Sequence, residues 1–192
     1  MRLNKRLDTL SLAGNFIKNI DLTNNTKLIK VDLNTNEWNS VIGLEKALGL
    51  NWLSLSKNLL EEFSIHNTSL ETLYIKDNLL KNLVVDNALN LKTIFAQINK
   101  IETIDLSSNV LIENLGLSDN KINHINLDQN TNIKILYLSS NLLLDFDVSM
   151  LQDLYYLVID RNPNLSCIKI HNNQNISNLT KSDYQELNTA CN

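Results

Sequence analysis

Eight asparagines recur along this chain at almost constant intervals. They are Asn15, Asn36, Asn58, Asn78, Asn99, Asn120, Asn141 and Asn162. Successive members are separated by 21, 22, 20, 21, 21, 21 and 21 residues. Each asparagine ends the same pattern, L-x-x-L-x-L-x-x-N, in which Ile, Val or Ala sometimes replaces Leu. A repeat of this length cannot bury its own apolar side chains, so the chain is constrained to stack equivalent coils on one another.

This pattern, with a period of about 20–29 residues, is the signature of a leucine-rich repeat. The sequence therefore predicts a right-handed leucine-rich repeat solenoid whose concave side is a parallel β-sheet of about eight strands. It predicts a short N-terminal segment over residues 1–6, eight repeats over residues 7–170 and a C-terminal cap over residues 171–192. The apolar content of 43% is sufficient for such a core, and the net charge of −4 argues against a nucleic-acid partner.

Each repeat contains the motif twice, because a second half such as IKNIDLTNN at residues 17–25 follows the asparagine. The alternation in Leu-x-Leu predicts a strand, and the second half leaves no room for a full helix. We therefore expect little or no α-helix in the repeats and an extended or turned convex side. Residues 41–49 depart from the pattern and are expected to bulge outward. Residues 182–187 are expected to form a short helix in the cap.

The recurring asparagine has a structural explanation. Each coil turns sharply after its strand, and this turn leaves backbone groups pointing inward that must be paired. An asparagine side chain offers two donors and one acceptor, so a buried ladder of them can satisfy its own turn and the next coil. Trp38, Phe63 and Phe146 stand where other repeats carry Ile or Leu, so we predict that these three side chains lie in the core.

Only two cysteines occur, Cys167 and Cys191, both near the C-terminal end. They are either two unrelated buried thiols or a disulfide that closes the cap. A disulfide would stabilise the fold by about 3 kcal/mol and would imply an oxidising compartment. The sequence has no apolar stretch of about 18 residues and no apolar signal segment after residues 1–6, so we expect neither a membrane span nor a signal peptide in it.

The repeat LxxLxLxxNxLxxLDLxxN resembles the nested 21-residue leucine-rich repeats of the IRREKO class, which are mostly bacterial. The segment NPNLSCI at residues 162–168, followed by Cys191, is similar to the end of secreted leucine-rich repeat proteins of Bacteroidetes. That resemblance implies a secreted or cell-surface protein with an upstream signal peptide and a downstream type IX secretion sorting domain. Because neither segment occurs in this sequence, we expect the chain to be part of a longer protein.

The side chains that flank the central leucines of each strand are predicted to point outward from the concave sheet. On that face the pattern places five of the chain's eleven aromatic residues, Trp52, Tyr74, Phe95, Tyr137 and Tyr156. Lys76, Gln97 and Ile135 are predicted beside them. Exposed apolar patches and aromatic side chains are typical of interaction sites, so we predict that these eight residues bind a partner. The alternative is that the rings only stabilise cross-strand pairs.

Several kinds of partner fit such a surface. A protein or peptide would use the rings as the centre of its interface. A glycan would stack sugar rings on Trp52, Tyr74 and Tyr137, although few carboxylate or amide side chains are available beside them. In a third hypothesis, the protein associates with itself through the rings or through its open first coil. We favour a protein or peptide partner.

The sequence gives no support for catalysis. It contains no G-x-S-x-G, P-loop or HExxH motif, and its three histidines lie in different repeats without metal-ligand spacing to a cysteine. Asp105, Asn126 and Asp147 share one convex position, which we interpret as a solvated face rather than a cation site. We therefore predict a non-enzymatic recognition protein, secreted or at the cell surface, that needs no metal and no cofactor.

Overall fold

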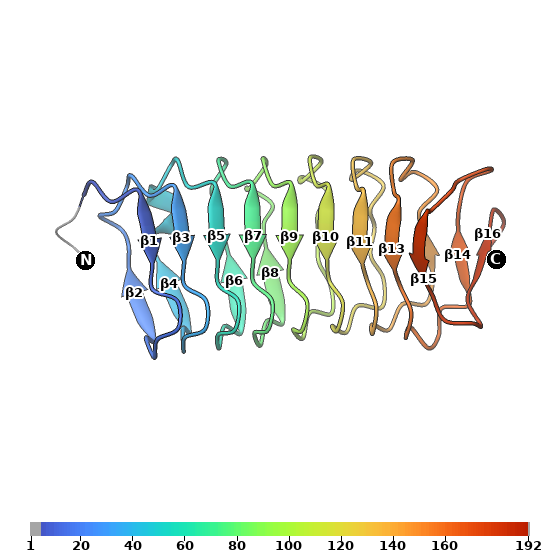
Figure 1. The fold of residues 1–192 in the computed structure, drawn as a ribbon, viewed down its shortest axis with the longest axis horizontal. Coiled ribbons are helices and arrows are strands. Elements are labelled where there is room, and N and C mark those ends of the chain that lie inside the picture. Colours follow the sequence, from blue (N-terminus) through green and yellow to red (C-terminus); the bar gives the residue numbers. More distant parts are fainter. Residues whose placement is uncertain (1–4, 192) are drawn as a thin grey trace.

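The computed structural model describes residues 5–191, so residues 1–4 of the predicted N-terminal segment and the last residue of the predicted cap lie outside it. The chain winds into a solenoid whose coils stack along one axis, with the two ends of the chain at opposite ends of the stack (Figure 1). Each coil contributes one short strand to a parallel sheet, the main sheet, whose described part has nine strands. The strands are β1 (Thr9–Ser11), β3 (Lys30–Asp32), β5 (Trp52–Ser54), β7 (Thr72–Tyr74), β9 (Thr93–Phe95), β10 (Asn114–Gly116), β11 (Ile135–Tyr137), β13 (Tyr156–Val158) and β15 (Asn178–Thr180).

The opposite, convex side of the coils is extended or turned, as predicted. Its strands form two pairs, β2-β4 and β6-β8, and one three-stranded sheet, β12-β14-β16. They are β2 (Asn19–Asp21), β4 (Ser40–Ile42), β6 (Glu62–Ser64), β8 (Asn82–Val84), β12 (Phe146–Asp147), β14 (Cys167–Lys169) and β16 (Glu186–Asn188). Within residues 5–191 the one helical element is the 3₁₀ helix η1 (Leu44–Lys46), so the predicted lack of α-helix in the repeats is confirmed.

The irregular part of the second repeat contains the 3₁₀ helix η1. After β4 the chain turns at Gly43, whose φ of 90° places it in the left-handed region. A Cβ atom there would lie 2.1 Å from the backbone nitrogen of Thr23, so no other residue fits. Leu44 and Ala47 are buried, whereas Leu48 is 78% exposed. The predicted outward bulge is therefore a single 3₁₀ turn that keeps its apolar side on the core.

The core is a continuous row of aliphatic side chains that passes through all the coils. The middle residue of each strand from β3 to β13 in the main sheet, for example Leu53 or Leu136, is inaccessible to solvent. Trp38, Phe63 and Phe146 are also buried, as predicted. The polar atom of the Trp38 indole is satisfied, because its Nε1 donates a hydrogen bond to the carbonyl of Leu33 at 2.8 Å.

The recurring asparagines form a ladder of hydrogen bonds. At Asn141, Nδ2 donates to the carbonyls of Leu138 and Ser139 in its own turn and to that of Leu117 in the preceding coil. Its Oδ1 accepts the N–H of Ile122, also in the preceding coil, at 3.0 Å. The same four bonds recur from Asn36 to Asn162. Each rung thus ties two coils together through their backbones.

The residue before each ladder asparagine lies in the left-handed backbone region. Its φ is between 53° and 57° at seven non-glycine positions, and only the first coil carries a glycine there. The seven are Thr35, Lys57, Asp77, Ile98, Asp119, Ser140 and Arg161. Such a conformation costs a non-glycine residue about 1–2 kcal/mol. This cost is greatest for the β-branched residues Thr35 and Ile98. The hydrogen bonds of the following asparagine hold the turn in place despite this cost.

A second, interrupted ladder lies on the convex side. Asn109 Nδ2 donates to the carbonyls of Val85 and Ala88 in the preceding coil, and Asn130 donates in the same way to Leu106 and Asn109. Asn67 Nδ2 and Gln174 Nε2 donate in the same way to backbone carbonyls of the equivalent turns in the coils that precede them. The sequence pattern predicted that this second half repeats, but it gave no prediction for the asparagines within it. Because Ala or Leu takes the position in other coils, the convex side is joined less regularly than the main sheet.

The segment predicted as a cap continues the stack. Strand β15 pairs with β13, and β16 pairs with β14. This adds a ninth strand to the eight expected, with Gln185 in place of a ladder asparagine. The helix predicted for residues 182–187 is wrong. The exposed edge of β14 offers unpaired backbone groups, and the N–H of Glu186 bonds the carbonyl of Ser166 at 2.8 Å, so a strand forms instead.

The two cysteines form a disulfide, as one of the two sequence hypotheses predicted. Cys167 in β14 is bonded to Cys191, and their Cα atoms are 5.8 Å apart. The bridge crosses 24 residues of sequence and ties the end of the chain to the preceding coil. It therefore closes the C-terminal end of the solenoid, where no further coil covers the stack in the described residues.

Replacing Asn141 by leucine tests the ladder. The change leaves the buried N–H of Ile122 without its partner and removes one of the two side-chain hydrogen bonds to the carbonyl of Leu117. We therefore expect the free energy of unfolding in urea to fall by about 1–3 kcal/mol. Asn15→Leu is the matched control, because within residues 5–191 the side chain of this exposed end rung bonds only the carbonyls of Leu12 and Ala13 in its own turn. Equal losses in the two variants would contradict a ladder that works between coils.

Replacing Cys167 and Cys191 by serine tests the C-terminal closure. Loss of the bridge frees a loop in the unfolded chain and is expected to cost about 3 kcal/mol. Because each coil of a solenoid contacts only its neighbours, the amides of β14 and β16 should exchange with solvent faster while those of β9 keep their protection. Hydrogen exchange followed by mass spectrometry measures this. A uniform rise along the whole chain would argue against a local closure.

Candidate functional site

The outward side chains of the main sheet form straight rows, because its strands pair in parallel and in register. Trp52 is paired with Thr72, and Phe95 is paired with Gly116, which in turn is paired with Tyr137. In each strand the middle residue points into the core and its two neighbours point away from it. We call this outer surface the main-sheet face. Every predicted partner-binding residue lies on it or in the turn that follows its strand.

The five aromatic residues predicted on this face form one unbroken strip. Trp52 contacts Tyr74, with ring centroids 5.7 Å apart, and Tyr74 stacks on Phe95 at 5.6 Å. Phe95 contacts Tyr137 at 6.2 Å, and Tyr137 contacts Tyr156 at 5.4 Å. All five side chains are half-buried, because each ring covers part of its neighbours. We refer to these five residues as the aromatic strip.

The strip is continuous because of Gly116. Phe95 and Tyr137 belong to strands separated by β10, so their backbones lie about 9.6 Å apart, twice the strand spacing. Gly116 stands between them, and a Cβ atom there would lie 2.5 Å from Cδ1 of Phe95 and 2.3 Å from Nε2 of Gln97. Both side chains therefore lean over the glycine, which allows the rings to meet. Gly116 was not among the predicted residues of the candidate site, although glycine in a strand is a known signal of close approach.

Polar side chains border the strip on the side of the turns. Lys76 is exposed, and Gln97 is half-buried. The Oε1 atom of Gln97 is buried and has no hydrogen-bond partner within residues 5–191. Ile135 is half-buried beside Tyr156, with which it is paired. The predicted rim thus offers a cation, an unpaired amide oxygen and an apolar side chain around the rings.

The opposite border carries a row of alternating charges. The Nζ atom of Lys92 lies 3.0 Å from Oε2 of Glu71, and Nζ of Lys134 lies 3.0 Å from Oε2 of Glu113. The hydrogen bond and charge of Glu113 raise the pKa of Lys134 above its usual value. Because these pairs are solvent-exposed, each contributes at most about 1 kcal/mol. Their main effect is to satisfy the charges on that side of the strip.

Neighbouring side chains also affect the aromatic residues at the two ends of the strip. The ammonium of Lys30 lies 4.5 Å from the centre of the Trp52 ring and covers one of its faces, a cation–π contact. At the other end, burial raises the pKa of the Tyr137 hydroxyl, and the neighbouring Tyr156 raises it further.

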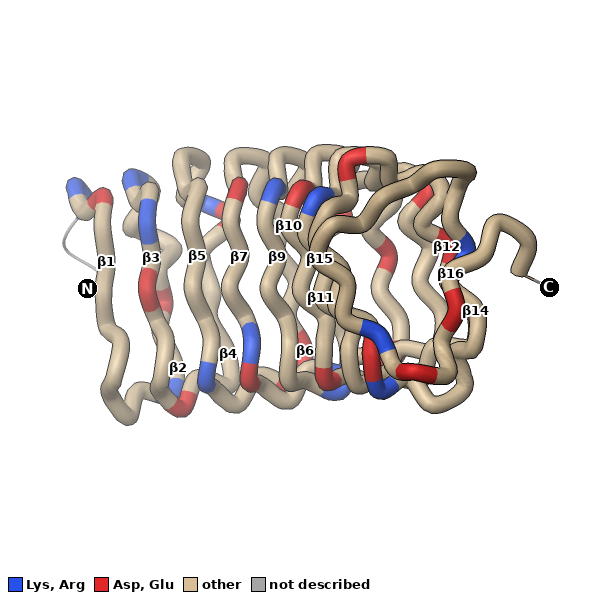
Figure 2. Tube along the Cα trace, turned by 45° about the vertical axis from the view of Figure 1, so that its right-hand side comes forward, with Lys and Arg blue, Asp and Glu red and all other residues tan. Residues whose placement is uncertain are grey.

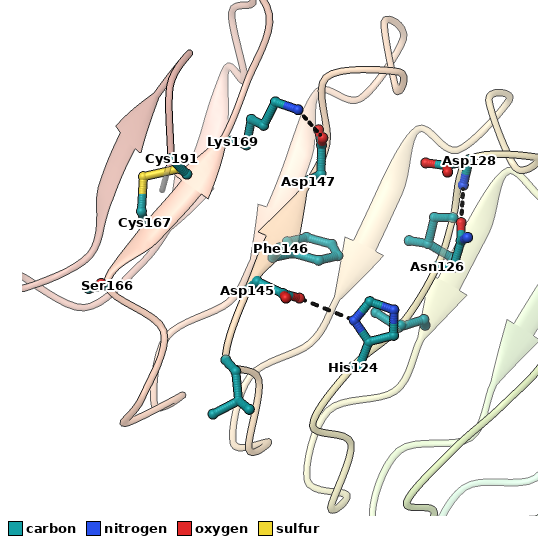
Figure 3. A pocket seen from close by; sticks show the side chains of 13 residues that line it. His124, Asn126, Asp128, Asp145, Phe146, Asp147, Ser166, Cys167, Lys169 and Cys191 are labelled. Atoms are coloured by element: carbon teal, nitrogen blue, oxygen red, sulfur yellow. Dashed lines mark hydrogen bonds and ion pairs between the residues drawn. A yellow bond between two sulfur atoms is a disulfide. The ribbon is translucent and has the colours of Figure 1, made fainter.

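The convex side has a hollow of about 460 Å³ that is lined by residues 124–128, by β12 and by β14, shown in Figure 3. His124 lies 3.1 Å from Asp145 across it, and Lys169 lies 2.8 Å from Asp147. Burial opposes the charge of Asp147, but hydrogen bonds from Lys169 and Ser149 outweigh it and hold the pKa of Asp147 below its usual value. Four of the lining residues thus contact one another in one His–Asp hydrogen bond and one Lys–Asp ion pair.

The series of convex polar residues Asp105, Asn126 and Asp147 is explained by local turns. Each side-chain oxygen accepts the backbone N–H two residues later, at Ser107, Asp128 and Ser149. Across residues 5–191, no group of three His, Cys, Asp or Glu side chains is arranged to hold a metal ion. In the same part of the chain, no helix has the length and apolar character needed to cross a bilayer.

The main-sheet face therefore offers binding chemistry. It combines a large half-buried aromatic area with unpaired polar atoms. In the convex hollow, His124 bonds Asp145 and Lys169 pairs with Asp147. Aromatic anchors surrounded by polar groups are typical of interface centres.

No protein-family model matches this chain, and no curated protein matches its sequence. Solved structures do match it. Internalin C2 of Listeria monocytogenes is 22% identical, with a TM-score of 0.64, over 92% of this chain and 74% of that one. A leucine-rich repeat protein of Leptospira interrogans is 20% identical, with a TM-score of 0.60, over 85% of this chain and 54% of that one. Toll, in the Toll–Spätzle complex of Drosophila, is 19% identical, with a TM-score of 0.71, over 85% of this chain and 26% of that one.

These similarities establish the fold. The chain is a leucine-rich repeat solenoid, as the period of its asparagines predicted. It spans about half the length of the first structures that it matches, 43% and 54% in two of them.

Replacing Gly116 by alanine tests the continuity of the aromatic strip. The new Cβ atom must displace Phe95 and Gln97, so we expect the nuclear Overhauser contacts between Phe95 and Tyr137 to disappear. The stability should fall by about 1–2 kcal/mol from overpacking. Gly49→Ala is the control, because its Cβ would lie 4.0 Å from Ile29, an ordinary contact. Retained ring contacts in the Gly116 variant would show that the strip does not need the glycine.

Proposed function

We propose that this protein is a non-catalytic recognition module that binds a protein or peptide through the main-sheet face. The observation that carries this proposal is the continuous aromatic strip of Trp52, Tyr74, Phe95, Tyr137 and Tyr156. Rigid aromatic side chains supply contact area at a low cost in conformational entropy. Lys76, Gln97 and Ile135 form its rim and give the partner polar and apolar contacts.

The fold supports the same class of function. Toll, a protein of similar fold, is known in a complex with another protein, Spätzle. A stacked sheet with in-register rows presents a rigid surface, so little ordering is required when a partner docks. In the ion-pair border, Lys92 and Lys134 each pair with a glutamate, which supports the aromatic strip and its turn-side rim as the proposed contact region.

A glycan is the second candidate, and the geometry of the rings favours it less. Sugar rings stack on open, flat aromatic faces. Here the ring planes of Trp52 and Tyr74 are tilted by 57°, Phe95 meets Tyr137 edge to face at 64°, and Tyr74 and Phe95 stack on each other at 27°. Lys30 also covers one face of Trp52. The strip therefore presents mixed edges and faces, which suit the side chains of a protein.

The disulfide supports a location at the cell surface or outside the cell. Bonds such as Cys167–Cys191 persist in oxidising compartments and are rare in the cytosol. The NPNLSCI segment and the nested 21-residue repeats support an origin among secreted bacterial proteins of the Bacteroidetes type. In that setting the aromatic strip serves adhesion or the capture of an external protein.

Replacing Tyr74, Phe95 and Tyr137 together by alanine tests the proposal. Interface aromatics commonly contribute about 2 kcal/mol or more each, so the triple variant should bind a verified partner at least about 100-fold more weakly. Phe16→Ala is the control, because Phe16 is 86% exposed but lies in the turn after the first ladder asparagine. Affinity is measured by surface plasmon resonance, and urea unfolding verifies that each variant is folded.

The alternatives give different results. Unchanged binding in the triple variant would reject the aromatic strip as the site. Ring-dependent signals on a glycan array, without a protein partner, would favour the carbohydrate hypothesis. A ring-dependent dimer in light scattering at high concentration would favour self-association.

A further inference from the structure

A pocket opens on the main-sheet face at the N-terminal end of the aromatic strip. It has a volume of about 350 Å³ and lies over strands β5 and β7 and the turns that follow β3, β5 and β7. Its lining residues are Asn34, Thr35, Trp52, Ser54, Ser56, Lys57, Tyr74 and Lys76. The pocket is large enough for one amino-acid side chain and its neighbour, and its two ends differ in chemistry.

The floor of the pocket contains an unpaired buried hydroxyl. Asn34 Oδ1 accepts hydrogen bonds from the Ser54 hydroxyl at 2.6 Å and from the backbone N–H of Ser56 at 2.7 Å. Ser56 itself is only 4% exposed, and its Oγ has no hydrogen-bond partner within residues 5–191. Leaving a buried hydroxyl unpaired is costly, so a ligand that accepts its hydrogen bond gains free energy.

The turn-side end of the pocket is cationic. Lys57 and Lys76 are exposed, and in the described part of the chain neither belongs to an ion pair, unlike Lys92 and Lys134 across the face. Figure 2 shows a basic position in the turn that follows each of β5 and β7. The nearby carboxylates of Asp32 and Asp77 are not part of the lining, and that of Asp32 accepts the N–H of Asn34 at 3.2 Å.

The opposite end is aromatic. The rings of Trp52 and Tyr74 contact each other, and the ammonium of Lys30 covers one face of Trp52. A ligand in this pocket would therefore place an apolar group against the two rings and an anionic oxygen toward Lys57, Lys76 and the Ser56 hydroxyl. Lysine suits this role as a point charge, and a hydroxyl donor adds direction.

We propose that this pocket receives the carboxylate of an Asp or Glu side chain from an acidic peptide segment whose neighbouring residue is apolar. This inference rests on the proposed function, because it names the chemistry of the partner that docks on the same face. The aromatic strip supplies contact area along the solenoid, and the pocket selects an acidic anchor at one end. An acidic polysaccharide is disfavoured because the tilted rings and Lys30 leave little flat aromatic surface for sugars.

The probe is a random-peptide display library selected on the whole protein. Enriched peptides are then synthesised, each with a counterpart in which Gln or Asn replaces the acidic residue. Their affinities are measured by isothermal titration calorimetry for the wild type, for Lys57→Gln with Lys76→Gln, and for Ser56→Ala. Lys100→Gln with Lys121→Gln is the control, since it removes the same charge from turns outside the pocket. Binding of alginate oligomers to the same variants is measured as the test for an acidic polysaccharide ligand.

We expect the enriched peptides to carry an acidic residue beside an apolar one. Neutralising that residue, or both Lys57 and Lys76, should weaken binding about tenfold. Ser56→Ala should weaken it about threefold, whereas the control should stay within about twofold. Higher salt should reduce only the carboxylate-dependent part of the affinity.

Two other variants separate this inference from the proposed function. Phe95→Ala with Tyr137→Ala changes the strip outside the pocket. If peptides depend on these rings but not on an acidic residue, Lys57 or Lys76, the proposed function stands and the pocket assignment falls. If no peptide is enriched, or if no enriched peptide depends on the rings, the proposed function and the pocket assignment are both rejected for a peptide partner. Lysine-dependent binding of alginate without acidic peptides would assign the anion to a glycan and overturn the inference.

Discussion

The side-chain hydrogen bonds of the ladder asparagines are the interaction on which this solenoid depends. Each rung bonds the backbone of its own turn and of the preceding coil, so the turn and the register between coils are fixed together. The turn requires a left-handed residue in every coil. Seven coils meet that requirement without glycine, at a cost of about 1–2 kcal/mol each. Four hydrogen bonds of about 1 kcal/mol per rung offset this cost.

Register is what converts a repeated sequence into a surface. Because every coil is held at the same height, outward side chains 20 to 22 residues apart in sequence stand side by side. The rings of Trp52 to Tyr156 can then meet along the solenoid, and Gly116 bridges the one strand that carries no ring. A slip of one residue in any coil would turn its outward side chains into the core and break the row.

The two sides of the solenoid differ in how some of their charged side chains are paired. On the convex side, His124 pairs with Asp145 and Lys169 pairs with Asp147. On the main-sheet face, the Ser56 hydroxyl and the Gln97 amide oxygen are buried without partners, and no ion pair within residues 5–191 includes Lys57 or Lys76. Within the same residues, buried oxygens without partners also occur on the convex side, at Asn109 and Asn130. The continuous aromatic strip, beside which Ser56 and Gln97 lie, is therefore the feature that favours the main-sheet face as the proposed binding surface.

The sequence by itself determined the period, the fold, the strands of the main sheet and the row on which each outward side chain stands, because a strict repeat fixes all of these through one hydrogen-bonded turn. It also indicated the pairing of Cys167 with Cys191. Tertiary structure alone decided the bridge over Gly116, the placement of Lys30 on Trp52 and the strand rather than a helix at Glu186–Asn188. These features depend on the direction of side chains and on free strand edges in neighbouring coils, which residue spacing does not record.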